Sequence, residues 1–239
     1  MNDPIASSNP CPEPPPIPAA QPPGTTLGEI LDALLKRPAS LVQHLCAAKS
    51  SRYWVRLALA SVTAFALYGL LIGTFSGGEQ LLAGPLKVAG GMILSAMICF
   101  PSLYIFLALT GVEITLRGLA GILFAMLALT GLLLLGFAPI AWVFSQSTES
   151  VAFVGALYLA IWCVATLIGL RLLAMAAPSR SVAHLIVWEM IFVMVALQMT
   201  TALRPIVGVA PDWIPKEKKF FVSYWAENLF KSEPSRAAE

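Results

Sequence analysis

The sequence predicts an all-α integral membrane protein: a polytopic bundle of about five transmembrane helices, with amphipathic interfacial helices before and after it. Two observations lead to this fold class. Of the 239 residues, 58% are hydrophobic and only 12% are charged, and the apolar residues fall into long runs separated by short polar stretches. A soluble domain carries roughly 25% charged residues, because water has to solvate its surface. Lipid removes that requirement, so this composition indicates a chain solvated by a bilayer.

Residues 1–25 form the first segment, which we predict to be a disordered, proline-rich tail. It contains half of the prolines of the chain, and proline has no amide hydrogen for a helix or a sheet. Pro12, Pro15 and Pro18 have the PxxP spacing that docks in aromatic grooves of partner proteins, and a plain solvated spacer is the alternative. The tail lacks the pattern of a signal peptide, so we expect the first span to act as a signal anchor.

Residues 26–54 are predicted to form amphipathic interfacial helices. Thr26 and Glu29 have the spacing of a capping box at a helix start, and Pro38 is expected to end the first helix. Apolar residues follow the helical period and form one face: Leu27, Ile30, Leu31, Leu34 and Leu35. Trp54 is a candidate anchor at the membrane interface. The alternative is that these helices pack on the cytoplasmic face of the bundle itself.

The bundle itself is predicted over residues 55–204. A span needs about 20 mostly apolar residues to cross the hydrocarbon layer. Five segments satisfy this length: 57–75, 88–110, 118–144, 151–171 and 184–203. Pro101 should kink or break the second span and free a backbone carbonyl that needs a partner in the bundle.

Residues 205–239 form the last predicted segment. Its first apolar part is too short to span and is interrupted by prolines. An interfacial helix is expected at about 217–231, because its aromatic residues share one helical face. The candidate anchors on that face are Phe220, Phe221, Tyr224 and Trp225.

The distribution of basic residues predicts a cytoplasmic N-terminus, in what we expect to be a bacterial inner membrane. Positive charge favours the cytoplasmic side of a span. Five basic residues precede the first span, whereas the loop between spans three and four has none. Five spans then place the C-terminus outside, although it also carries basic residues, so a miscount by one span remains an alternative.

Two regions are candidates for a transport pathway or polar network. Glu189 is the only acid inside a predicted span, and a carboxylate in lipid costs about 2.5 kcal/mol or more. Gln198 follows it on the same span, and pairing with Arg180, Arg171 or a hydroxyl is the structural alternative. The Gly-rich loop 73–91, with Lys87, can be a re-entrant loop lining a cavity or a plain external loop.

Small residues at a spacing of four predict close helix packing. Gly69 and Gly73 form a GxxxG pair, and Gly91 with Ser95 has the same spacing. Such contacts serve packing within the bundle or between protomers. No ligand spacing for a metal, no cofactor motif and no paired catalytic groups occur, which gives little support to an enzyme. The formal net charge of +2 does not favour nucleic acid as a partner.

Several features resemble the Yip1 domain class of bacterial polytopic membrane proteins. They are ILDALLKRP at 30–38, AGPLK at 83–87, the five spans and the proline-rich tail. The resemblance implies a five-helix membrane domain that has a cytoplasmic N-terminus and binds partners rather than catalysing a reaction.

The function predicted from these observations is a non-catalytic scaffold or accessory subunit of a membrane complex. Its expected partners are the lipid bilayer and other membrane proteins or further copies of the chain. The alternative is a small transporter or channel with Glu189 and the loop 73–91 in its pathway.

Overall fold

Seven α-helices make up the described part of the chain, which confirms the predicted all-α class. The computed structural model describes residues 26–46, 52–76, 80–109, 111, 114–147, 151–176 and 182–202, and among these residues there is no strand. The helices are α1 (Leu27–Lys36), α2 (Pro38–Cys46), α3 (Arg52–Ser76), α4 (Gln80–Leu109), α5 (Leu116–Ser147), α6 (Val151–Ala174) and α7 (Val182–Ala202). The predicted tail 1–25 and the C-terminal segment 205–239, with Phe220, Phe221, Tyr224 and Trp225, lie outside the described residues.

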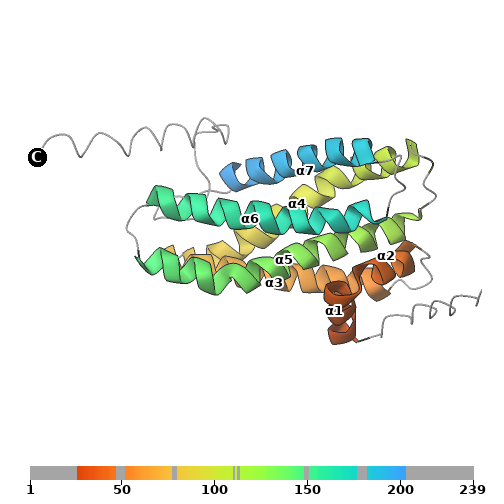
Figure 1. Cartoon of the computed structure of the whole chain (residues 1–239). Coiled ribbons are helices and arrows are strands. Elements are labelled where there is room, and N and C mark those ends of the chain that lie inside the picture. Colours follow the sequence, from red (N-terminus) through yellow and green to blue (C-terminus); the bar gives the residue numbers. More distant parts are fainter. Residues whose placement is uncertain are drawn as a thin grey trace, which may run out of the picture.

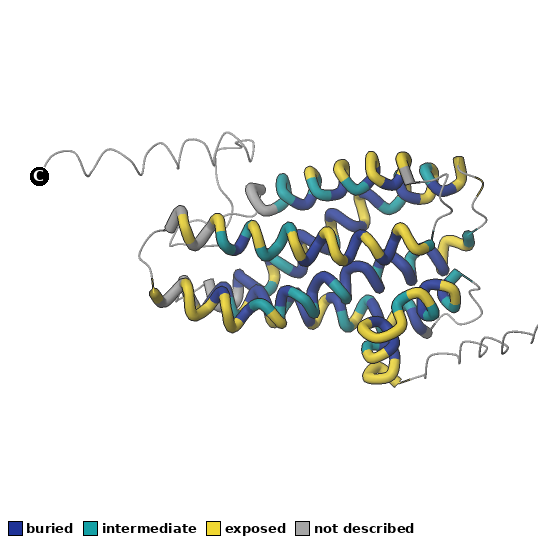
Figure 2. Tube along the Cα trace, in the orientation of Figure 1, coloured by how far each residue is buried: buried dark blue, intermediate teal, exposed yellow. Residues whose placement is uncertain are grey.

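Four of the helices are long and apolar enough to cross a membrane. Their candidate spans are Tyr53–Thr74, Ala83–Leu109, Leu116–Phe144 and Ala156–Ala174. Helix α7 adds a shorter apolar stretch, Ala183–Met199, and its 21 residues extend over about 30 Å, which is about the thickness of the hydrocarbon layer. Large apolar side chains remain exposed along the outside of the bundle (Figure 2). Both properties belong to a helical membrane bundle.

Consecutive long helices run in alternating directions, with α5 enclosed between α3 and α6 (Figure 1). Helix α4 contacts α3 along its first part and reaches α7 with its last part, whereas α6 and α7 hardly touch. Helices α1 and α2 lie at the end of the bundle where α3 and α5 begin. The long helices therefore form a ring that is closed least tightly between α6 and α7.

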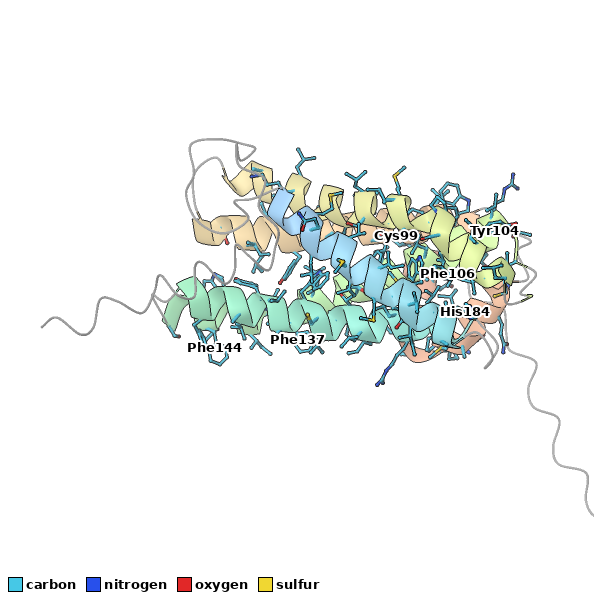
Figure 3. The ribbon with its side chains drawn as sticks, turned by 90° about the horizontal axis from the view of Figure 1, so that it is seen from above. Cys99, Tyr104, Phe106, Phe137, Phe144 and His184 are labelled. Atoms are coloured by element: carbon cyan, nitrogen blue, oxygen red, sulfur yellow. The ribbon has the colours of Figure 1, made fainter. Side chains whose placement is uncertain are left out.

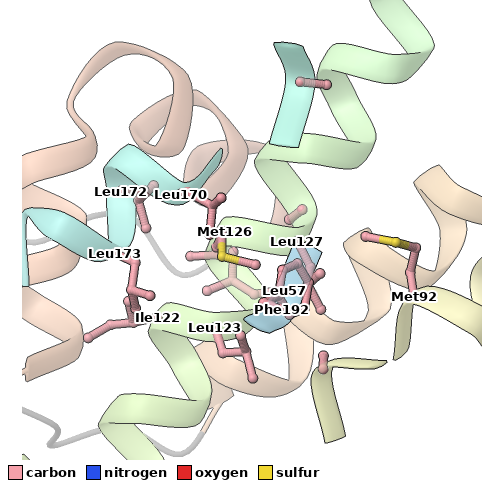
Figure 4. Packing of buried hydrophobic residues seen from close by; sticks show 14 of the residues in the cluster. Leu57, Met92, Ile122, Leu123, Met126, Leu127, Leu170, Leu172, Leu173 and Phe192 are labelled. Atoms are coloured by element: carbon pink, nitrogen blue, oxygen red, sulfur yellow. The ribbon is translucent and has the colours of Figure 1, made fainter. Parts of the chain in front are cut away.

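The interior between these helices is filled by apolar side chains. Leu57 of α3, Met126 of α5, Leu170 of α6 and Phe192 of α7 are all buried in one cluster (Figure 4). Each of these helices has a lipid-facing side that is also apolar, so the amphipathic signal of a soluble helix is weak. Burial in the bundle is therefore decided by packing, not by the contrast between apolar and polar residues.

Glycines allow α3 and α4 to approach backbone to backbone. A Cβ atom added at Gly69 would lie 2.6 Å from the carbonyl oxygen of Gly84, and one added at Gly84 would lie 2.5 Å from the carbonyl oxygen of Gly69. It would also lie 3.4 Å from the Cα atom of Gly73. The GxxxG pair of α3 thus packs on Gly84, in the arrangement that small residues permit in membranes.

This contact corrects the predicted Gly-rich loop 73–91. Helix α3 continues to Ser76 and α4 starts at Gln80, so most of the predicted loop is helical, and the second span begins earlier than residue 88. Glycine has a low helix propensity, but at Gly84 it has two advantages. It permits the contact with α3, and it lacks the Cβ atom that would clash with the ring of Pro85 in a helical conformation.

Helices α1 and α2 pack on the end of the bundle. The predicted capping box is confirmed: the Glu29 amide donates to Thr26 Oγ1 at 3.3 Å and the Thr26 amide donates to Glu29 Oε2 at 2.9 Å. Hydrogen bonds from Thr26 lower the pKa of the Glu29 carboxyl. Ile30 and Leu45 are buried, and a Cβ atom at Gly118 of α5 would lie 2.7 Å from the carbonyl oxygen of Leu45. Of the two alternatives for this region, packing on the bundle is the one with observed contacts.

Candidate functional site

Trp188 joins α7 to α4. Its indole ring is fully buried, and its Nε1–H donates to the carbonyl oxygen of Cys99 at 3.0 Å and to Ser102 Oγ at 3.1 Å. The Ser102 hydroxyl itself donates to the Cys99 carbonyl oxygen at 2.8 Å. These side-chain bonds fix the height of α7 against α4, because they bring position 188 of one helix to the level of positions 99–102 of the other.

The same region of α4 contains Pro101, which lacks an amide hydrogen. Helix α4 is continuous through Pro101, so of the two predicted effects the break is wrong, and the kink stays a prediction. The missing amide leaves the carbonyl of Met97 without its usual donor within the helix. The interhelical bond from Trp188 goes to the carbonyl of Cys99 instead. The bonds from Trp188 and Ser102 thus lie within one turn of the proline but do not replace the bond that it removes.

Aromatic rings extend this contact along α7. The rings of Trp188 and Phe192 stack with centroids 5.4 Å apart, and both residues are buried. Nearer the start of α7, the rings of His184 and Phe106 of α4 have centroids 6.4 Å apart. Figure 3 shows Cys99 and Phe106 on α4, with His184 on the neighbouring end of α7. Helix α7 is therefore attached to the bundle mainly through α4.

Glu189 lies beside this attachment, on the edge of the buried face of α7. Its side chain is half-buried, whereas Leu185, Trp188 and Phe192 on the same helix are fully covered. It is the eighth residue of α7, so it lies about 10 Å along the helix from Val182. Within the described part of the chain, no hydrogen bond or ion pair reaches its carboxylate. The predicted pairing with Arg171 is not observed, and Arg180, the other predicted partner, lies outside the described residues.

The other two charged or amide candidates, Lys87 and Gln198, lie in the opposite half of the bundle. Lys87 precedes Cys99 by twelve residues, which corresponds to about 18 Å along α4. Gln198 follows Glu189 by nine residues, or about 14 Å in the same direction. Lys87 is buried and Gln198 is half-buried. The structure does not bring Glu189 together with either residue.

Two buried tyrosines in that opposite half were not expected from the sequence. Tyr68 of α3 and Tyr158 of α6 are both nearly covered. In the sequence, each is only a tyrosine placed one to three turns inside an apolar run. Because tyrosine is also common near span ends as an interface anchor, this position does not predict burial. Trp188 was missed as a bonding residue for the same reason.

The predicted packing and anchoring residues have the following positions. Ser95 is fully buried and its hydroxyl donates to the Gly91 carbonyl oxygen at 2.7 Å within α4. Trp54 stacks on Phe124 of α5 with centroids 6.3 Å apart. Trp54 thus contacts the bundle as well as lying near the start of a span. Among the described residues, no group of three His, Cys, Asp or Glu side chains is arranged to hold a metal ion.

Comparison with protein-family models, with curated proteins and with solved structures finds no match for this chain. The resemblance to the Yip1 domain class stays a prediction.

Proposed function

We propose that this chain is a non-catalytic scaffold or accessory subunit of a membrane complex. The observation that carries the proposal is how the buried hydroxyls between the spans are used. Ser61 donates to the carbonyl oxygen of Ala58, Ser95 to that of Gly91 and Thr130 to that of Met126. Each of these bonds is made within one helix. A pathway for a polar solute needs polar groups that face the solute. These three hydroxyls instead donate to backbone carbonyls of their own helices.

One buried hydroxyl of the described spans falls outside that pattern. Thr166 of α6 is buried and its hydroxyl has no hydrogen-bond partner. Lys87 of α4 is also buried. The two residues lie on different helices. Lys87 lies about 18 Å along the bundle from the level of Trp188, the neighbour of Glu189, so Lys87 and Glu189 do not form one polar site.

The close helix contacts support the same proposal. Opening a pathway by alternating access requires parts of the bundle to rock against each other. Backbone atoms of α3 and α4 meet at Gly69 and Gly84, and α5 packs on α3 where a Cβ atom at Gly131 would lie 2.8 Å from the Cβ atom of Ala64. Such crossings hold helices at one separation, because tightly packed interfaces do not deform gradually. This favours a rigid platform over a moving carrier.

The proposal also assigns an orientation and a membrane. The end that carries α1 and α2 also carries Lys36, Arg37, Arg56, Arg117 and Arg171, and in the spans the other end has Lys87. By the positive-inside rule, the α1–α2 end is cytoplasmic. A bacterial inner membrane is the proposed location.

Flux measurements on the full chain in liposomes test the proposal against a transporter. The expected result is that protons, sodium and potassium leak no faster than in empty vesicles, for both the wild type and Glu189→Gln. A proton or cation flux in the wild type that Glu189→Gln abolishes would overturn the scaffold function. Purification in mild detergent adds a second test, in which a monodisperse monomer without any associated protein counts against it.

A further inference from the structure

Helix α7 presents an apolar surface away from α4. We define the α7 outer face by its exposed residues Ile186, Val187, Met190, Ile191 and Met194. Figure 2 shows exposed positions along the side of α7 that points away from the bundle. None of the described helices covers this face, so within the described part of the chain it can contact lipid or another transmembrane helix. The flexible side chains of Met190 and Met194 suit contact with a partner, because methionine adapts to irregular surfaces.

Glu189 borders this face. It follows Ile186 by three positions, so the two side chains are neighbours on the helix surface and Glu189 lies at the Ile186 edge of the outer face. It lies about 10 Å inside the helix, which is deeper than the polar ends of α7. Transmembrane acids usually pair with another group or face the interior of a bundle. Among the described residues Glu189 has no paired group, and its half-buried side chain lies only at the edge of the buried face of α7.

We infer that the α7 outer face docks a transmembrane helix of a partner protein, and that this helix carries a lysine or arginine at the depth of Glu189. This inference rests on the proposed function and names the chemistry of its partner. The reason is charge complementarity: a cation beside Glu189 neutralises the carboxylate where water cannot, while the flanking Ile, Val and Met side chains supply the apolar contact. The face combines one acid with five apolar residues, which matches a mostly apolar helix with one base.

A second copy of this chain fits that requirement less well. The basic residues of its described spans lie near helix ends: Arg56 in the second turn of α3, Arg117 at the start of α5 and Arg171 in the last turn of α6. Lys87 lies toward the opposite end of the bundle, about 18 Å from the level of Trp188. A partner helix with a base further inside its span reaches Glu189 directly.

The experiment uses the full chain in phosphatidylcholine vesicles and three synthetic transmembrane helices. The helices are leucine-rich peptides that are identical except for arginine, glutamine or leucine at the eighth apolar position, which is the register of Glu189. Energy transfer from the tryptophans of the protein to a dansyl group on the peptide measures association. The expected result is that the arginine peptide binds at least about tenfold more tightly than the leucine peptide, a difference of about 1.4 kcal/mol.

Variants of the chain assign the preference to Glu189. Glu189→Gln is expected to remove the tenfold preference, and Glu189→Asp to keep most of it. Asp32→Asn removes the same charge from α1, outside the spans, and should leave the preference unchanged. Equal binding of the arginine and leucine peptides to the wild type would overturn the inference, whether or not Glu189→Gln folds. An arginine preference that persists in folded Glu189→Gln would also overturn it.

Two further outcomes separate this inference from its alternatives. If differently labelled copies of the chain associate through Glu189 while no peptide preference exists, the occupant is a second copy and the inference is wrong. If the peptides bind equally and no flux is found, the docking site fails but the scaffold function stands. A Glu189-dependent flux would overturn the scaffold function, and the wild-type peptide comparison would still decide the docking site by itself.

Discussion

Substitution of Gly69 by alanine tests whether backbone contact between α3 and α4 holds the bundle together. The added Cβ atom would lie 2.6 Å from the Gly84 carbonyl oxygen, 2.8 Å from Pro85 Cα and 2.9 Å from the Gly84 carbonyl carbon. All three are backbone atoms, so no side chain can rotate away. Ordinary contact begins at 3.4 Å, and the helices must therefore separate by about 0.8 Å. Overpacking of this kind costs about 1–3 kcal/mol.

Gly90→Ala on α4 is the matched control, because nothing lies within 4 Å of a Cβ atom at that position. Both substitutions gain the same helix propensity, about 0.5–1 kcal/mol, so their difference isolates the contact. Unfolding of the full chain in mixed micelles of mild detergent and dodecyl sulfate, followed by circular dichroism, measures that difference. We expect Gly69→Ala to be less stable than Gly90→Ala by about 1–3 kcal/mol. Equal stability of the two variants would refute the argument that this crossing is held by backbone contact.

Three further substitutions test the other contacts. Gly131→Ala should destabilise the α3–α5 contact by about 1–3 kcal/mol, and Ala64→Gly in the same chain should restore part of the loss, because it removes the Cβ atom at 2.8 Å; no recovery in the mixed-micelle assay would contradict the geometry. Trp188→Phe removes the indole donor and should cost about 0.6–1.7 kcal/mol, measured in the same way. Thr26→Ala should speed amide exchange in α1, since loss of such a cap costs about 1 kcal/mol. The pKa of Glu29 is lowered in the fold, so the stabilisation of α1 by the ionised Glu29 carboxylate is present at neutral pH and should be lost on acidification through that lowered pKa. Amide exchange rates in α1 that do not change over this pH range, beyond the intrinsic pH dependence of exchange, would contradict this.

Composition and apolar run length were sufficient to predict the all-α membrane bundle. Inside a bilayer every backbone amide and carbonyl needs a hydrogen bond within the chain, and a helix provides it. A run of about 20 apolar residues therefore predicts a membrane-spanning helix whatever the rest of the chain contains. Local signals were equally sufficient at the start of α1, where Thr26 and Glu29 bond within one turn. The predicted spans 57–75, 118–144 and 151–171 lie within α3, α5 and α6, whose ends extend up to five residues beyond them.

Contacts between helices could not be predicted from the sequence, because lipid-facing and buried positions are both apolar in a bilayer. Glycine and proline at Gly84 and Pro85 indicate a loop when taken alone, and only the approach of Gly69 explains why they are helical. Glu189 could be recognised as a costly residue from its position in an apolar run. Packing decided that Trp188 faces α4 and that Glu189 borders an exposed face of α7. A rotation of α7 about its axis would leave its apolar pattern almost unchanged, but it would alter every contact that the helix makes.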